Sequence, residues 1–152
     1  MTPHYRGEEL HYFNKKIETV EGQTGVDDYK RWLSTNPSVE HLIQSEALDR
    51  AAQAIAEEKG RQGRSDHEDP RAIYHLISRF GKVEGKIGEL MCLGGHSSEE
   101  IATYWLLDDG NASRSRRNML LSGKYKHMGV GSAYHPIHEV ITVVLLASNA
   151  QP

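Results

Sequence analysis

The stretch EVITVVLL, residues 139–146, is a nearly continuous run of apolar side chains rich in valine and isoleucine. Such a run is typical of a strand that is buried on both faces of its sheet. Residues 128–134 predict a second strand before it, and residues 86–92, KIGELMC, predict a shorter third one. A small sheet of this kind needs helices to cover it, which indicates an α+β or three-layer arrangement.

The clearest helix is predicted over residues 45–60, SEALDRAAQAIAEEKG. Ser45 fits the N-cap position, an apolar stripe recurs at helical spacing, and Gly60 is a suitable stop. Further helices are predicted over residues 26–37, 70–81 and 97–110, with a short helix or turn over residues 113–121. The helices precede and interleave with the strands, as in α+β proteins.

The chain has 152 residues, a length that suits one domain. We therefore predict a single domain over residues 1–152. Residues 1–25 mix charged, aromatic and glycine positions without sustained periodicity. They predict an irregular N-terminal arm, with a short helical piece around residues 8–16.

The composition excludes several classes of protein. With 18 basic and 21 acidic side chains the net charge is −3, which argues against nucleic acid as a partner because phosphate binding needs clustered positive charge. The one cysteine, Cys92, has no disulfide partner within the chain. No apolar run approaches the roughly 20 residues that span a membrane. The N-terminus lacks the apolar core of a signal peptide, so the chain is cytosolic or a mature form.

Three polar positions stand where packing does not obviously need them. His67 lies in a predicted loop among carboxylates, where it is either a solvated histidine or a ligand for a divalent ion. Glu89 lies inside an apolar strand, so it is either paired or points to solvent from an edge. Asp108 ends a predicted helix, where the helix dipole disfavours a negative charge, and we expect it to have a local partner.

The segment SRSRRN, residues 113–118, contains three arginines, and most arginines in such a segment are surface charges. His135 and His138 resemble a metal-binding pair, but a three-residue offset on a strand places the two side chains on opposite faces. A turn at Pro136, between the two histidines, weakens that objection without removing it. The sequence has no phosphate-binding loop, nucleophile elbow, His-Glu-x-x-His pair or Cys-x-x-Cys motif. The other histidines are expected to be surface or packing residues.

Taken in order, these segments resemble the CAP superfamily of cysteine-rich secretory, antigen five and pathogenesis-related proteins, in its compact microbial or protist branch. The resemblance runs from Thr19 to Ala147. Its pieces are VEG at 20–22, Pro37, SEALDRAAQ at 45–53, the Gly60 to His67 spacing, RFGKVEGKIGE at 79–89, DDG at 108–110 and GVGSAYHP at 129–136. The resemblance implies a three-layer α-β-α sandwich with a small central antiparallel sheet and a shallow cleft.

In that family two histidines and two acidic residues line the cleft and often hold a divalent ion. By position, the resemblance implies that the first histidine is His67, the glutamate is Glu89 and the second acid is Asp108. The family's Gly-Glu-Asn motif reads Gly-Glu-Leu here, so its asparagine is missing. The family's Ser-Arg-Gly-His-Arg segment corresponds to residues 113–117, and Arg116 stands where the second histidine would be.

That arginine has a chemical consequence. A guanidinium has no acceptor and stays protonated, so Arg116 cannot ligate a cation and repels one. His67 and Glu89 remain as candidate metal ligands, but a zinc site with three protein ligands is not expected. We hypothesise instead that Arg116 takes the place of the metal, as a fixed positive charge that bridges Glu89 and Asp108.

Two functions follow from the resemblance and the residues. The first is a binding or interaction module without catalysis, whose ligand is a lipid, a sterol or a protein. The alternative is a protease-like hydrolase in which His67 is the general base, Glu89 or Asp108 orients it, and Arg116 stabilises an oxyanion. No cofactor is expected. The resemblance implies a secreted or periplasmic location, and a cytoplasmic one stays open.

Overall fold

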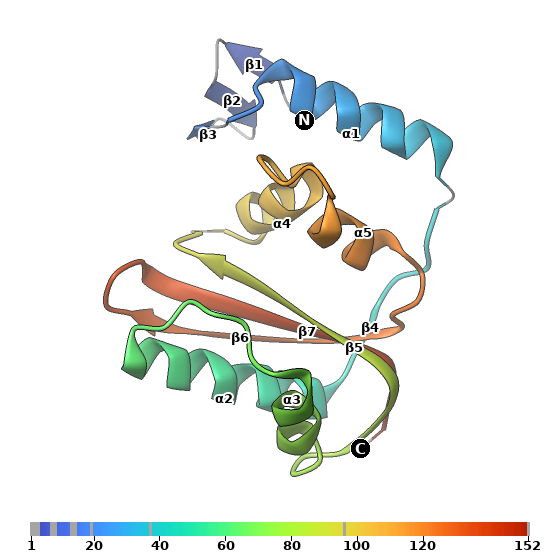
Figure 1. Ribbon diagram of the computed structural model, residues 1–152, viewed down its shortest axis with the longest axis vertical. Helices are drawn as coiled ribbons and strands as arrows, with labels where there is room; N and C mark the ends of the chain where they lie inside the picture. Colours follow the sequence, from blue (N-terminus) through green and yellow to red (C-terminus); the bar gives the residue numbers. More distant parts are fainter. Residues whose placement is uncertain are drawn as a thin grey trace. The chain divides into compact units, whose positions relative to one another are not determined.

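The computed structural model describes residues 4–6, 9–12, 15–18, 20–36, 38–95 and 97–151 (Figure 1). The chain divides into two compact units. One comprises Met1–Val39 and Glu99–Leu121, and the other comprises Glu40–Ser98 and Ser122–Pro152. A single domain over residues 1–152 stays a prediction.

The second unit contains a four-stranded sheet with the order β4-β6-β7-β5. Its strands are β4 (Ile43–Gln44), β5 (Lys82–Leu93), β6 (His127–His135) and β7 (Glu139–Gln151). The three strands predicted from the sequence are β5, β6 and β7, and they pair antiparallel as expected. The two-residue strand β4, which was not predicted, adds one parallel pairing with β6. Two residues are too few to carry a period-two signal.

Strand β7 is the central strand, with β6 on one side and β5 on the other. Its residues from Val143 to Ala147 are all buried. Five successive buried positions cannot all point to one face, since side chains of a strand alternate between faces. The prediction that this strand is buried on both faces is therefore confirmed.

Helix α2 (Glu46–Gln62) packs directly on β6. Ser45 caps it, since its Oγ accepts a hydrogen bond from the backbone N–H of Leu48 at 3.3 Å. A Cβ built on Gly129 would lie 2.1 Å from the carbonyl carbon of Leu48, and one built on Gly131 would lie 2.3 Å from the backbone nitrogen of Gln53. The two glycines, spaced by two on one face of β6, allow the helix backbone to touch the strand backbone.

Gly60 has the same role from the helix side. A Cβ there would lie 2.1 Å from the carbonyl oxygen of Tyr134. The expectation that Gly60 ends the helix is wrong, because the helix continues to Gln62 and ends at Gly63, which has the left-handed conformation with φ 64°. Sequence alone does not distinguish a glycine needed for close packing from one that terminates a helix.

Side chains of α2 also occupy the outer edge of β6 beyond β4. Asp49 Oδ1 accepts a hydrogen bond from the N–H of Val130 at 2.9 Å. The side-chain amide of Gln53 bonds to both the N–H and the carbonyl of Ser132, at 3.0 and 2.9 Å. These contacts satisfy backbone groups that would otherwise leave an open strand edge, a common site of unwanted pairing between chains.

Helix α3 (Pro70–Ile77) packs against α2 and β5. Asp69 is its N-cap, because its carboxylate accepts a hydrogen bond from the N–H of Arg71 at 2.8 Å, and Pro70 occupies the first turn, where proline is favoured. The core of this unit is formed by side chains of α2, α3 and β7. Its buried members are Leu48, Ala51, Ala52, Ile55, Ala56, Ile73, Ile77, Ile141, Val143, Leu145 and Ala147.

The first unit contains helices α1 (Gln23–Thr35), α4 (Ser98–Leu107) and α5 (Ser115–Leu121). It also contains β1 (His4–Arg6), β2 (Glu9–Tyr12) and β3 (Lys15–Glu18), which pair antiparallel in that order. These strands replace the irregular arm and the short helical piece that we expected. Strands of three or four residues form mainly through backbone pairing with a neighbouring strand. In a segment with many charged residues, the alternation of apolar and polar residues that predicts a strand is weak. Among the described helices none is long and apolar enough to span a membrane.

Candidate functional site

Glu89 is a buried carboxylate with three partners in the sheet unit. It lies on β5, and only 4% of its side chain is exposed. Its Oε1 is 2.7 Å from Nδ1 of His67 and accepts the N–H of Glu68 at 3.1 Å. Its Oε2 lies 3.3 Å from Nζ of Lys59. Burial of a carboxylate is costly unless it is paired, and here it is paired on both oxygens.

Lys59 belongs to the candidate site, although no sequence pattern indicated it. It lies on α2 and is fully buried, and its Nζ also contacts Sδ of Met91 at 3.1 Å. The apolar stripe of the helix includes Ile55, so helical periodicity places a residue four positions later on the same buried face. A lysine at that position needs a buried anion, and Glu89 is the carboxylate that the neighbouring strand provides.

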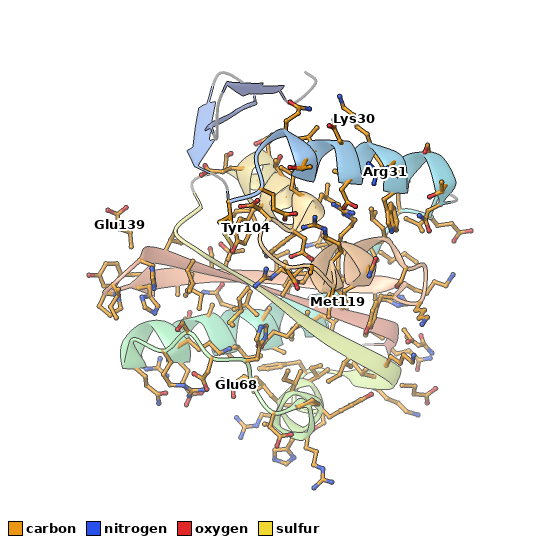
Figure 2. The ribbon with its side chains drawn as sticks, turned by 45° about the horizontal axis from the view of Figure 1, so that its top comes forward. Lys30, Arg31, Glu68, Tyr104, Met119 and Glu139 are labelled. Atoms are coloured by element: carbon orange, nitrogen blue, oxygen red, sulfur yellow. The ribbon has the colours of Figure 1, made fainter. Side chains whose placement is uncertain are left out.

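His67 lies at the surface end of this group. Its side chain is 59% exposed, and its bond to Glu89 fixes the ring through Nδ1. The neighbouring acids do not gather around the ring. Asp66 pairs with Arg64 at 2.9 Å, and this hydrogen bond lowers the pKa of Asp66. Glu68, which is labelled in Figure 2, also pairs with Arg64, at 3.0 Å. The structure therefore joins His67 to one carboxylate, that of Glu89.

Asp108 in the first unit is fully buried and has φ 53°, a left-handed conformation that is rare outside glycine. Its Oδ2 accepts hydrogen bonds from the backbone N–H groups of Arg116 at 2.8 Å and Arg117 at 3.3 Å. Its Oδ1 accepts from Nη1 of Arg116 at 3.1 Å and from Nδ2 of Asn111 at 3.2 Å. The expected local partner of Asp108 is confirmed, and it is the first turn of α5.

Two arginines of the segment 113–118 form the interior of this unit instead of lying at its surface, contrary to our expectation. Arg117 is fully buried, donates to the carbonyls of Leu106 and Leu107 at 2.6 and 3.1 Å, and pairs with Asp28 at 2.9 Å. Arg114 holds both carboxylate oxygens of Glu21, at 2.5 and 2.6 Å. These bonds lower the pKa of Asp28 and raise that of Arg114. Because their donors bind carbonyls and carboxylates within the same unit, these two arginines have a structural role.

The ion pair between Arg114 and Glu21 predicts how the stability of the fold depends on pH. The hydrogen bond from Arg114 lowers the pKa of Glu21 from 4.5 to about 2. A carboxylate whose folded pKa is depressed stabilises the fold above its unfolded pKa, and this contribution is lost as the pH falls through the folded pKa. Because 28% of the Glu21 side chain is exposed, we expect about 1–2 kcal/mol after allowance for solvent screening.

Urea unfolding of the wild type and of Glu21→Gln between pH 6 and pH 2 measures this contribution. The wild type should be the more stable at pH 6, and the difference should shrink between pH 4.5 and pH 2. A difference that is constant over that range would contradict the assignment of this stabilisation to the charged form of Glu21.

The four candidate residues form two pairs, one in each unit. His67 pairs with Glu89, and Asp108 pairs with Arg116. The part of our hypothesis that joins Arg116 to Asp108 agrees with the 3.1 Å distance between Nη1 of Arg116 and Oδ1 of Asp108. For Glu89 the cationic partner is Lys59, and the bridge from Arg116 to Glu89 stays a prediction. In the ranges that the structure describes, three or more histidine, cysteine or acidic side chains nowhere form a group that could hold a metal ion.

His135 is buried and has both ring nitrogens engaged within the protein. Its Nε2 lies 2.9 Å from the carbonyl oxygen of Arg64, while Nδ1 accepts hydrogen bonds from the N–H groups of Ile137 and His138 at 3.2 and 3.3 Å. An Nδ1 that accepts and an Nε2 that donates define the neutral ring. His135 therefore anchors the turn between β6 and β7, and it has no nitrogen left for a metal.

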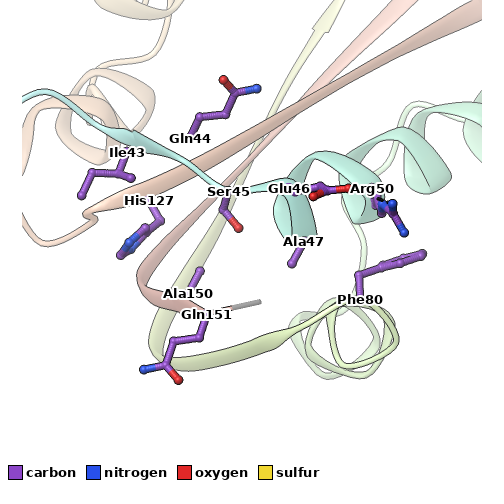
Figure 3. A pocket seen from close by; sticks show the side chains of 10 residues that line it. All are labelled: Ile43, Gln44, Ser45, Glu46, Ala47, Arg50, Phe80, His127, Ala150 and Gln151. Carbon is purple, nitrogen blue, oxygen red and sulfur yellow. Dashed lines mark hydrogen bonds and ion pairs between the residues drawn. The ribbon is translucent and has the colours of Figure 1, made fainter.

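A separate pocket of about 360 Å³ is lined by β4, the start of α2, the start of β6, the end of β7 and Phe80, which follows α3 (Figure 3). Apolar side chains of Ile43, Ala47 and Phe80 line it together with polar ones. Its two charged side chains, Glu46 and Arg50, pair with each other at 2.7 Å. The pocket is therefore neutral, and its lining does not include His67 or Glu89.

Three solved structures are similar to this chain over most of its length. An outer surface protein from Borrelia burgdorferi aligns with a TM-score of 0.58 and 16% identity, over 84% of this chain and 94% of that one. An extracellular protein containing an SCP domain from Bacillus anthracis aligns with a TM-score of 0.59 and 13% identity, over 83% of this chain and 38% of that one. A cysteine-rich secretory protein from Staphylococcus aureus aligns with a TM-score of 0.52 and 15% identity, over 93% and 43%.

These similarities show that the chain has an SCP-like fold, the fold of the CAP superfamily. The expected α+β class is confirmed. The chain spans less than half of the Bacillus and Staphylococcus proteins and nearly the whole of the Borrelia one. Comparison with family models and with curated proteins finds no match.

Proposed function

We propose that this protein is a CAP-type module that works by binding a lipid, a sterol or a protein and does not catalyse a reaction. The observation that carries this proposal is the salt bridge between Lys59 and Glu89, at 3.3 Å in the interior of the sheet unit. A protonated lysine there neutralises Glu89, which removes it as a free base and as a cation ligand. Asp108 is likewise held by two backbone N–H groups and Arg116.

The serines of the segment 113–118 support the same proposal. The hydroxyl of Ser113 donates to Oδ1 of Asn111 at 2.9 Å, and the Oγ of Ser115 accepts from Nδ2 of Asn111 at 2.9 Å. Both hydroxyls therefore take part in the turn before α5. A serine nucleophile needs a hydroxyl that is hydrogen-bonded to a general base, and an asparagine amide is not a base.

The hydrolase alternative is favoured by one contact, the 2.7 Å bond between Nδ1 of His67 and Glu89. A carboxylate that holds Nδ1 of an imidazole orients the ring and leaves Nε2 as the possible general base. The exposure of the His67 side chain makes that nitrogen accessible to a substrate. The alternative therefore depends on a nucleophile that Nε2 can reach.

A fluorophosphonate probe of serine hydrolases distinguishes the two functions. We expect the wild-type protein to remain unlabelled, as judged by fluorescence in a denaturing gel and by the intact mass. His67→Ala and heat-denatured protein serve as controls for labelling that does not depend on the folded site. Labelling of the folded wild type that disappears in His67→Ala would establish the hydrolase and overturn the binding function.

We also propose that zinc is not a resident ligand, because a cation near Glu89 would meet the positive charge of Lys59. Calorimetric titration of the wild type with zinc should show no binding tighter than micromolar. The matched variant is Lys59→Met, which removes the positive charge and leaves His67 and Glu89 in place. Sub-micromolar binding to the wild type that is lost in His67→Ala would refute this proposal.

A location outside the cytoplasm is part of the proposed function. The three similar structures are described as an outer surface, an extracellular and a secretory protein. Immunoblots of the culture medium, the envelope and the cytosol of the source cells test it, and protein confined to the cytosol would contradict it.

A further inference from the structure

Arg116 differs from Arg114 and Arg117 in how many of its side-chain nitrogens donate hydrogen bonds. Its Nη1 donates to Oδ1 of Asp108 at 3.1 Å, whereas its Nε and Nη2 donate to no residue within the described ranges. Arg114 and Arg117 each use all three side-chain nitrogens on carboxylates or backbone carbonyls. A guanidinium presents its donors as a planar fork, so Arg116 keeps one edge of that fork available.

The guanidinium of Arg116 is also held in position. Asp108, which binds Nη1, is fully buried and fixed by backbone N–H groups of α5. On a second side, Cζ of Arg116 lies 5.7 Å from the centroid of the Tyr104 ring, within the range of a cation–π contact. Figure 2 shows Tyr104 on α4. An arginine held by two contacts loses less conformational freedom when it binds a ligand than a free one does.

Arg116 and Tyr104 are both partly exposed. The side chain of Arg116 is 35% exposed, and Tyr104 is 43% exposed although it is a large aromatic residue. The first unit thus presents a fixed positive charge next to an aromatic ring. This combination suits a ligand that carries a planar anion and an apolar part.

We infer that Arg116 and Tyr104 form a binding site for a carboxylate attached to an aromatic or aliphatic group. The two carboxylate oxygens would accept hydrogen bonds from the unused edge of the guanidinium, and the apolar group would pack on the Tyr104 ring. The inference rests on the proposed binding function, and it names the chemistry of the ligand that Arg116 and Tyr104 would bind. Inorganic phosphate can bind a guanidinium but gains nothing from the ring.

The test is titration of the ¹⁵N-labelled protein with benzoate, followed through the arginine Nε–H signal and the backbone amides of residues 104–117. We expect saturable shifts at millimolar benzoate, as one charge-assisted pair and one ring contact give. Benzamide, the neutral isostere, should cause no saturable shift. Acetate and phosphate should bind about threefold more weakly than benzoate, since they lack the contact with the ring.

Two variants separate the charge from the ring. Arg116→Lys keeps the charge but loses the fork, and it should weaken benzoate binding about tenfold, which corresponds to about 1.4 kcal/mol. Tyr104→Leu should reduce benzoate binding to the level of acetate. Arg71→Lys is the matched control, an exposed arginine in the other unit, and it should change nothing. Thermal unfolding of each variant checks that it is folded.

Benzoate that causes no saturable shift, or that binds Arg116→Lys as tightly as the wild type, would overturn the inference. Equal shifts with benzamide, or unchanged benzoate binding in Tyr104→Leu, would overturn it as well. These outcomes leave the proposed binding function standing, because that function is tested by the fluorophosphonate probe. Labelling by the probe would reject the binding function without touching the carboxylate site.

Discussion

Gly131→Ala is expected to lower the free energy of unfolding by at least about 3 kcal/mol. The new Cβ would lie 2.3 Å from the backbone nitrogen of Gln53, 2.4 Å from its Cα and 2.5 Å from the carbonyl carbon of Ala52. These atoms belong to the backbone of the helix face that packs on β6, so rotation of a side chain cannot relieve the clash. The helix α2 and the strand β6 must separate, which opens a gap beside the core residues Ala51 and Ala52.

Urea unfolding monitored by circular dichroism measures this loss. Ser132→Ala is the matched control, because it changes the next residue of the same strand, whose side chain is exposed and whose contacts with Gln53 use backbone atoms alone. It should change the unfolding free energy by less than about 0.5 kcal/mol. A loss of less than about 1 kcal/mol in Gly131→Ala would mean that α2 does not lie on the strand backbone.

Lys59→Met is expected to cost about 3–5 kcal/mol, the usual effect of removing one partner from a buried ion pair. Methionine keeps the apolar stem and the approximate volume of lysine. What is lost is the positive charge 3.3 Å from Glu89, whose carboxylate is 4% exposed and cannot be hydrated in place. His67 and the N–H of Glu68 remain as partners of Oε1. The destabilisation arises at Oε2, which loses Nζ of Lys59.

A double-mutant cycle tests whether the loss arises from the pair. Lys59→Met combined with Glu89→Leu replaces both charges by apolar groups, and it should be more stable than Lys59→Met alone by about 2 kcal/mol. Lys82→Met is the matched control, since Lys82 and Glu84 form an ion pair that is more than half exposed, and its effect should be within about 0.5 kcal/mol. Strictly additive effects of the two buried changes would show that Lys59 and Glu89 do not interact.

Much of the fold could be predicted from local patterns. The helix predicted over residues 45–60 has strong periodicity and lies within two residues of its actual bounds, Glu46–Gln62. The apolar run over residues 139–146 marks the start of β7 correctly, but the strand continues to Gln151. The strand β4 has two residues and the strands β1–β3 have three or four each. Such short strands are formed by backbone pairing with a partner, and the pairing leaves little trace in the sequence.

The candidate site was predictable only one residue at a time. The position of Glu89 in an apolar strand indicated a buried pair, but the choice of Lys59 as its partner depends on how α2 packs against β5. The bonds of Arg117 to the carbonyls of Leu106 and Leu107 depend on the end of α4. A hydrophobicity pattern treats these charged residues as surface, because it has no information about buried acceptors.

The sequence by itself determined the α+β class, the central strand and the presence of an arginine at position 116, where the resembling family has a histidine. These depend on side-chain periodicity and on residue chemistry, which are local properties of the chain. The tertiary structure decided which charges meet: Lys59 with Glu89, Arg114 with Glu21, and Arg116 with Asp108. A charge can be buried only where folding brings an opposite charge or an acceptor to within hydrogen-bond distance. In the first two pairs the partners lie 30 and 93 positions apart in the sequence, so only the packing of the fold brings them together.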